Sequence, residues 1–156
     1  MKANDMDNQK VIDRLNTLID TCKDGEYGFR TCADHVKSTD LKTVFLERAG
    51  ECQRGASELQ SIVARLGGKA DTGSSVAGTL HRGWVSVVGA LRGYSDQAML
   101  DECERGEDAA LERYRSALKD DGLPADAMAL VQKQYEGVKR NHDQIRNLRD
   151  QARAAS

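Results

Sequence analysis

The sequence has little proline, few aromatic residues and no long apolar run, and each of these shortages excludes some classes of protein. One proline occurs in 156 residues, and aromatic residues make up 4% of the chain. Because proline breaks a helix interior, its scarcity leaves long stretches that can be helical. The chain is 39% hydrophobic and 31% charged, which favours one ordinary helical domain over a disordered chain.

Further absences argue against several environments and partners. The apolar stretches are far shorter than the about 20 residues that span a bilayer, so we expect no membrane association. The polar start "MKANDMDNQK" is unlike a signal peptide, which predicts a cytoplasmic protein. The net charge is −2 with both signs interleaved along the chain, so we expect no nucleic acid partner.

The four cysteines form no C-x-x-C pair. They are Cys22, Cys32, Cys52 and Cys103, and a zinc cluster would show tighter ligand spacing. We interpret them as small buried apolar residues in a reducing cytosol.

Apolar residues recur at steps of three and four in four segments, which predicts four helices in a single domain. Ser38 or Thr39 can cap the second helix by accepting backbone N–H bonds, and Gly122 and Pro124 suit the boundary before the fourth. Glycines weaken the first half of the third helix, so we expect a kink or break near Gly93–Tyr94. The predicted ranges are roughly 9–37, 40–66, 79–119 and 124–153.

The connections between these helices differ in length. Short turns join the first helix to the second and the third to the fourth, whereas "GGKADTGSSVAG" (Gly67–Gly78) is a long polar connection. This pattern predicts an all-α, ferritin-like four-helix bundle with a long crossover between helices two and three. A simple up-down-up-down bundle with an extended second loop is the alternative.

Four glutamates fall at one level of the predicted bundle. Glu26 and Glu51 are equally far from the first turn, and Glu107 and Glu136 are equally far from the last. With straight helices, the four carboxylates lie within about 3 Å of one level along the axis. Glu107 also interrupts the apolar stripe of residues 100–118, where a charge needs a partner.

Ferritin-like metal sites combine two glutamates with two Glu-x-x-His motifs, and this chain lacks both histidines. Arg54 and Lys139 stand at those positions instead, and neither side chain has a lone pair to offer a metal. We therefore expect Glu107 to form an internal ion pair with Arg54 or Lys139.

A metal site is the alternative hypothesis. His142 lies on the apolar face of the fourth helix and joins the candidate ligands if the register of the last turn shifts. Oxygen ligands without imidazole favour hard ions such as Mn²⁺ or Mg²⁺ over a reactive iron pair. The candidate metal ligands are Glu26, Glu51, Glu107, Glu136 and His142.

Four separated blocks carry a resemblance to a known family. They are "LNTLIDTCKDGEYGFRTCADHV", "LHRGW", "ECERGEDAALERYRSAL" and "NHDQIRNLRD", and the resemblance covers the chain from about Lys10 to Asp150. The chain resembles a family of small proteobacterial ferritin-like four-helix-bundle proteins of unknown function. The resemblance implies a ferritin-like bundle and supplies no activity. Both Glu-x-x-His motifs of the di-iron members of the wider group are missing here, which argues against iron oxidation.

No complete catalytic set is recognisable, whether Ser-His-Asp, a phosphate-binding loop or a Cys-His pair. The sequence therefore favours a non-catalytic binding or structural protein without a cofactor. Such a bundle would dimerise or dock a partner, and the glycine-interrupted segment Trp84–Tyr94 is where self-association is expected. The alternative is a carboxylate-rich metal protein of degenerate di-iron type, holding Fe or Mn. A ligand cavity between the helices is a third hypothesis.

Overall fold

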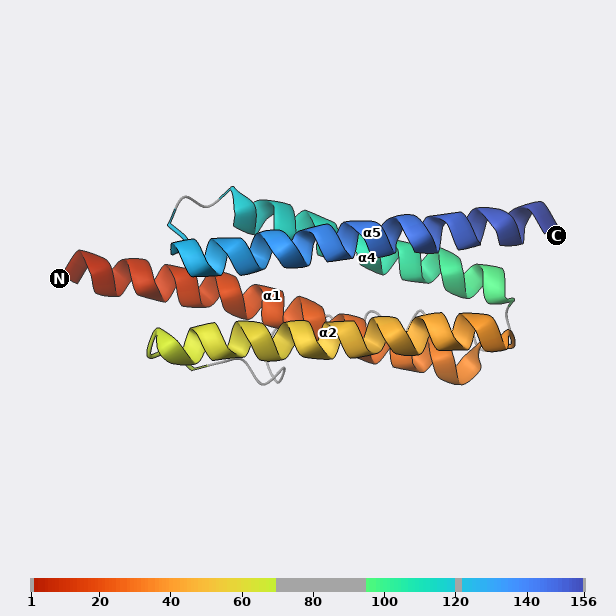
Figure 1. Cartoon of the computed structure of the whole chain (residues 1–156), viewed down its shortest axis with the longest axis horizontal. Helices are drawn as coiled ribbons and strands as arrows, with labels where there is room; N and C mark the ends of the chain where they lie inside the picture. The colour runs from red at the N-terminus through yellow and green to blue at the C-terminus, as the bar shows by residue number, and fades with distance from the viewer. Residues whose placement is uncertain (1, 70–94, 120–121, 156) are drawn as a thin grey trace.

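The computed structural model describes residues 2–69, 95–119 and 122–155, and this part of the chain is helical without any strand. No helix in it is both long enough and apolar enough to cross a membrane. The all-helical class predicted from the sequence is confirmed. Figure 1 shows the four helices, which are α1 (Lys2–His35), α2 (Thr39–Arg65), α4 (Asp96–Leu118) and α5 (Ala125–Ala155).

Side chains fix the turn between α1 and α2 and tie it to α4. The Ser38 hydroxyl accepts the backbone N–H of Leu41 at 3.2 Å, so Ser38 is the cap of α2. The backbone N–H groups of Lys37 and Ser38 both donate to the carboxylate of Asp96, at 2.9 Å each. These bonds satisfy helix-end groups that have no partner within their own helix, and they hold three helices together at one end of the molecule.

The third predicted helix is described only in its second half. α4 begins at Asp96, where Ser95 accepts the backbone N–H of Ala98 at 3.2 Å. This start follows directly on the break expected near Gly93–Tyr94. Residues 70–94, which hold most of the predicted crossover and the expected self-association segment Trp84–Tyr94, lie outside the described residues.

The helices form two antiparallel hairpins that pack unevenly. α1 packs along α2, α4 packs along α5, and α1 joins the hairpins by packing on α4 (Figure 1). The contact between α2 and α5 is the sparsest of the four neighbouring pairs. α2 ends and α4 begins at opposite ends of the molecule (Figure 1).

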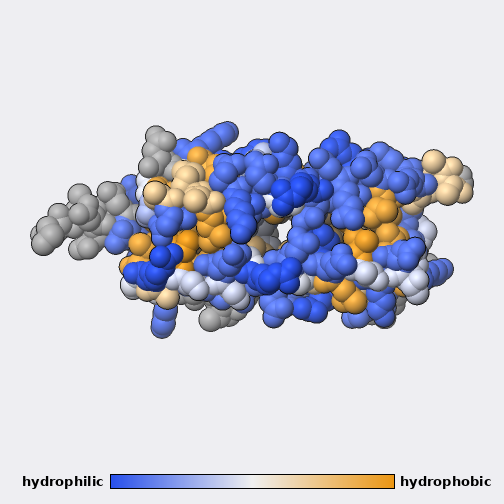
Figure 2. Space-filling model, viewed as in Figure 1, coloured by the Kyte–Doolittle hydropathy of each residue, from blue (hydrophilic) through white to orange (hydrophobic). Residues whose placement is uncertain are grey.

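The core is divided into two apolar clusters along the helices. Leu15, Leu59 and Val131 belong to the cluster near the end of α2, and Phe29 and Phe45 belong to the cluster near the start of α2. Each fully buried side chain of this size stabilises the fold by about 1.5–3 kcal/mol. Figure 2 shows two hydrophobic areas separated by a hydrophilic middle on the face that it presents.

The cysteines are free thiols, as the sequence predicts. Cys22, Cys32 and Cys103 are buried and Cys52 is partly buried. The Cys103 thiol contacts the Cys32 sulfur at 3.6 Å. Burial raises the pKa of Cys22 to about 11 and raises that of Cys103 well above its usual value. All of this fits packing roles, because the reactive form of cysteine is the thiolate.

Candidate functional site

A buried ion pair occupies the middle of the molecule, between the two apolar clusters. Arg48 of α2 donates through Nε and Nη2 to Oε1 of Glu107 on α4, at 3.2 and 2.9 Å. Both side chains are only 4% exposed. The guanidinium also lies over the Phe29 ring, 5.3 Å from its centroid, where an arginine is attracted to the face of the ring. The charge in the apolar stripe of α4 thus has its counter-ion.

The partner expected from the sequence was wrong. Arg54 is exposed and pairs with no carboxylate within the described residues, and Lys139 lies over the Tyr135 ring at 5.9 Å. Neither forms an ion pair with Glu107. Ferritin-like sites place a histidine three positions after a glutamate, which is why Arg54 and Lys139 were expected. The actual cation, Arg48, lies three positions before Glu51 in the sequence.

Helical spacing could have predicted that Arg48 lies on the buried face of α2. Arg48 lies three residues after Phe45 and four residues before Cys52, so all three share one face of α2. Phe45 and Cys52 are two turns apart on the apolar face of this helix, and Arg48 occupies the position between them. An arginine in such a gap is a candidate for a buried cation, since its long stem packs among apolar groups.

A second carboxylate completes the coordination of Arg48. Glu51 Oε2 accepts from Arg48 Nη1 at 2.8 Å and from Asn141 Nδ2 at 2.9 Å, although Glu51 is 45% exposed. Burial works against the charge on Arg48, but Glu107 and Glu51 outweigh it, so the pKa of Arg48 is raised. Burial raises the pKa of Glu107, and the nearby Arg48 charge opposes that rise.

The four glutamates proposed as metal ligands form no common ligand group within the described residues. Glu51 and Glu107 meet at the same guanidinium, which holds each of them in an ion pair. Glu26 pairs with Arg30 one turn along α1. Glu136 is exposed and accepts from Gln132 one turn earlier on α5 at 2.8 Å.

His142, the fifth candidate ligand, faces different carboxylates. Its side chain is buried, as its place on the apolar face predicts. Its Nε2 atom lies 2.6 Å from Asp108 Oδ1 and 3.8 Å from Glu104 Oε1, both on α4. Sequence reasoning missed these two acids, although their spacing of four places them on one face of α4.

A cavity of about 800 Å³ lies beside the ion pair and is lined by all four helices. Its volume falls in the range of about 300–1,000 Å³ that is usual for small-molecule sites. Small residues on three helices leave this space: Gly55, Gly106, Ala109, Ala110 and Gly137. At Gly137 an added Cβ would meet only the Arg140 guanidinium at 3.8 Å, whereas at Gly55 it would lie 3.3 Å from Cys22 Sγ, so Gly137 borders open space and Gly55 allows close packing.

The inner wall of the cavity carries a chain of hydrogen bonds. The Cys22 thiol contacts the Tyr114 hydroxyl at 3.3 Å, and that hydroxyl donates to Gln134 Oε1 at 2.8 Å. Gln134 Nε2 donates in turn to the Gly55 carbonyl at 3.2 Å. Burial raises the pKa of Tyr114 well above its usual value. Because these groups are neutral and fixed by one another, they form a rigid polar wall.

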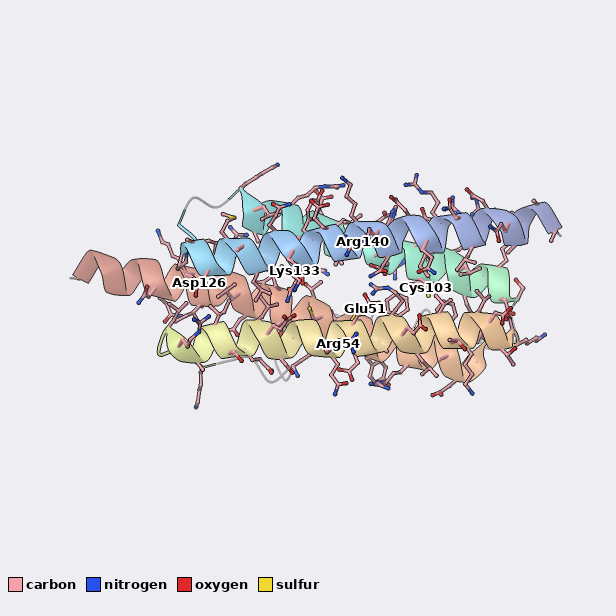
Figure 3. All side chains as sticks on the ribbon, viewed as in Figure 1. Glu51, Arg54, Cys103, Asp126, Lys133 and Arg140 are labelled. Carbon is pink, nitrogen blue, oxygen red and sulfur yellow. The ribbon has the colours of Figure 1, made fainter. Side chains whose placement is uncertain are left out.

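Cations without counter-ions surround this wall. Arg54, Arg113, Lys133 and Arg140 all line the cavity, and the described residues place no carboxylate within 4.0 Å of their charged groups. Figure 3 shows Arg54 on α2 and Lys133 and Arg140 on α5, in the middle stretch where these two helices face each other. The lining also contains four carboxylates, those of Asp24, Glu51, Glu58 and Glu107, against six cationic side chains, so the cavity has a modest excess of positive charge.

The described residues form a four-helix protein with a central cavity. The model of a family described as a domain of unknown function (DUF2383) matches residues 10–120. Because the match covers well over half of the chain, the protein belongs to this family. The matched range includes Arg48 and Glu107 and ends before α5. A search of curated proteins found no match to the chain.

Proposed function

We propose that the protein is a non-catalytic ligand-binding bundle whose central cavity takes a small organic anion with an apolar body. The observation that carries the proposal is the set of unpaired cations around the cavity of about 800 Å³. A cation that no protein carboxylate neutralises attracts anions, and low-dielectric walls strengthen that attraction. Phe29 and Val138 supply apolar lining for the body of the ligand.

The groups inside the cavity support binding over catalysis. The raised pKa values of Cys22 and Tyr114 keep both groups protonated near neutral pH, so neither is poised as a nucleophile or a general base. The Glu107 carboxylate is engaged by two hydrogen bonds from Arg48.

The finer fold assignment belongs to this proposal. We infer a ferritin-like bundle with a crossover, because α2 ends and α4 begins at opposite ends of the molecule (Figure 1). A chain that joins those ends must run the length of the bundle. The four free thiols fit a reducing compartment such as the cytoplasm. Self-association through Trp84–Tyr94 stays a prediction, which light scattering over a range of concentrations tests.

Fluorescence titration of the whole protein with anilinonaphthalene sulfonate, an apolar anion, tests the proposed cavity. We expect one site per chain, with affinity lowered about tenfold or more in the double variant Lys133→Gln/Arg140→Gln. The matched control is Lys10→Gln/Lys42→Gln, which removes two exposed charges outside the cavity lining and should bind as the wild type does. Equal affinity in the two double variants would overturn the role of the rim cations.

A second pair of variants tests the space itself. A Cβ added at Gly137 meets nothing closer than the Arg140 guanidinium at 3.8 Å, so Gly137→Leu extends into the cavity without a backbone clash. We expect it to abolish probe binding. The control is Gly50→Leu, where a Cβ has similar room, 3.5 Å from Arg54, but Gly50 does not line the cavity. Unchanged binding in Gly137→Leu would show that the probe binds elsewhere.

The metal hypothesis for Glu26, Glu51, Glu107 and Glu136 remains a second proposal with less support. Arg48 already forms ion pairs with two of the four carboxylates. Metal analysis after loading with iron or manganese tests it, and a metal lost in Glu107→Ala but kept in Asp108→Asn would favour this set.

A further inference from the structure

Three potential metal ligands converge where α4 meets α5. Glu104 and Asp108 lie one turn apart on α4, and His142 faces them from α5. One ligand atom from each lies within 4.8 Å of the other two, and they form the only group of at least three histidine, cysteine or acidic ligands found in the described residues. None of the three lines the central cavity. The cluster is thus separate from the site proposed above.

The imidazole of His142 lacks a hydrogen bond on the side that faces the acids. The residue is 8% exposed, and its Nε2 atom is buried without a hydrogen-bond partner in the described part of the chain. Asp108 Oδ1 lies 2.6 Å away without forming a hydrogen bond to this nitrogen, and Glu104 Oε1 at 3.8 Å is too distant for one. A buried nitrogen aimed at two carboxylate oxygens without bonding either one is what a shared cation would satisfy.

The other ring nitrogen, Nδ1, supports metal binding at Nε2. Nδ1 of His142 contacts Asp143 Oδ1 at 3.4 Å. When Nδ1–H donates to a carboxylate, the lone pair is left on Nε2, which is the arrangement that supports metal-binding histidines in proteins. Glu104 is held in a similar way, because Arg149 binds its Oε2 atom and leaves Oε1 toward His142.

We propose that Glu104, Asp108 and His142 bind a divalent transition-metal ion, with zinc as the representative. Ligand atoms about 2.1 Å from one ion lie roughly 3–3.5 Å apart, and the two separations from His142 Nε2, 2.6 Å and 3.8 Å, fall on either side of this range. Asp108 is 61% exposed and is free to make the small adjustment needed. One imidazole and two carboxylates form a three-ligand set that leaves a position for water. The imidazole favours Zn²⁺ over Mg²⁺, which prefers oxygen ligands.

Calorimetric titration of the chelator-treated whole protein with Zn²⁺ tests the proposal. We expect one ion per chain, with affinity reduced at least 100-fold in His142→Ala and at least tenfold in Asp108→Asn. Asp143→Asn, which removes only the supporting carboxylate, should weaken binding about tenfold. His35→Ala is the matched control, because His35 contacts the Thr31 carbonyl of its own helix at 2.8 Å and lies outside the cluster.

Each alternative gives a distinct result. Zinc bound by the thiols would survive both His142→Ala and Asp108→Asn, and would overturn the assignment. A plain histidine–aspartate ion pair would leave the wild type without measurable zinc binding, which would also overturn it. Binding of Mg²⁺ as tight as that of Zn²⁺ would contradict the choice of a transition metal. Should His142→Ala fail to fold, the exposed Asp108 still provides the decisive variant.

Discussion

Two charged clusters lie close together on α4 but face different neighbours. Glu107 faces α2 and accepts two bonds from Arg48. Glu104 and Asp108 face α5, where the buried Nε2 of His142 bonds neither. The first cluster is closed, since cation and anion satisfy each other in the interior. The second is open, and an exposed aspartate borders it. The comparison teaches that a buried charged group whose hydrogen bonds are all made by the protein has a structural role. A buried polar group that lacks a partner is a candidate binding site.

Removing the cation of the closed cluster should strongly reduce the stability of the protein. Arg48→Met leaves Glu107 buried with no other cation within ion-pair distance in the described residues, and we expect a loss of about 3–5 kcal/mol in the free energy of unfolding. Glu107→Gln should cost only about 1–2 kcal/mol, because Arg48 keeps Glu51 as a partner. Urea denaturation measures both.

Arg54→Met is the matched control for that comparison. Arg54 is exposed and belongs to no ion pair of the described residues, so its loss should change the stability by less than about 0.5 kcal/mol. If Arg48→Met were as mild as Arg54→Met, the buried pair would have no structural importance.

A double-mutant cycle isolates the energy of the pair itself. Arg48→Met combined with Glu107→Leu replaces both charges with apolar groups, and such replacements are often neutral or stabilising. We expect the double variant to lie within about 1 kcal/mol of the wild type, so that the coupling energy with the single variants Arg48→Met and Glu107→Leu is at least about 3 kcal/mol. Strict additivity of the two single substitutions would contradict a direct ion pair.

The pH dependence of stability gives a smaller effect. The pKa of Glu107 in the folded protein is raised above its ordinary value of 4.5, mainly by burial. Folding then takes up a proton, so the stabilising contribution is complete below pH 4.5 and is lost as the pH rises through the folded-state pKa. The stability of the wild type relative to Glu107→Gln should fall over this interval and stay level above it. A difference that rises with pH would mean that Arg48 outweighs burial.

Local features of the fold were predictable from the sequence. The helical spacing and the serine cap at the start of α2 depend on neighbouring residues, and the structure has Ser38 in that role. His142 was correctly placed in the interior because its stripe is apolar on both sides. These features require no knowledge of how one helix is set against another.

The partners across helices were not predictable in the same way. The burial of Arg48 was not predicted, because arginine is usually exposed and its partner Glu107 lies on another helix. Glu104 and Asp108 look like an exposed face of α4, and only the packing of α5 brings His142 beside them. The register between helices is set by side-chain packing in three dimensions, which residue spacing gives only to within about one turn.

Zinc calorimetry on two neighbouring substitutions of α4 tests the contrast between the clusters most directly. Glu107→Gln changes the closed cluster and Asp108→Asn changes the open one, each with the loss of one negative charge. The account predicts wild-type zinc affinity in Glu107→Gln and at least a tenfold loss in Asp108→Asn. The reverse result, with zinc affinity lost in Glu107→Gln and kept in Asp108→Asn, would contradict it and favour a metal at the central glutamates.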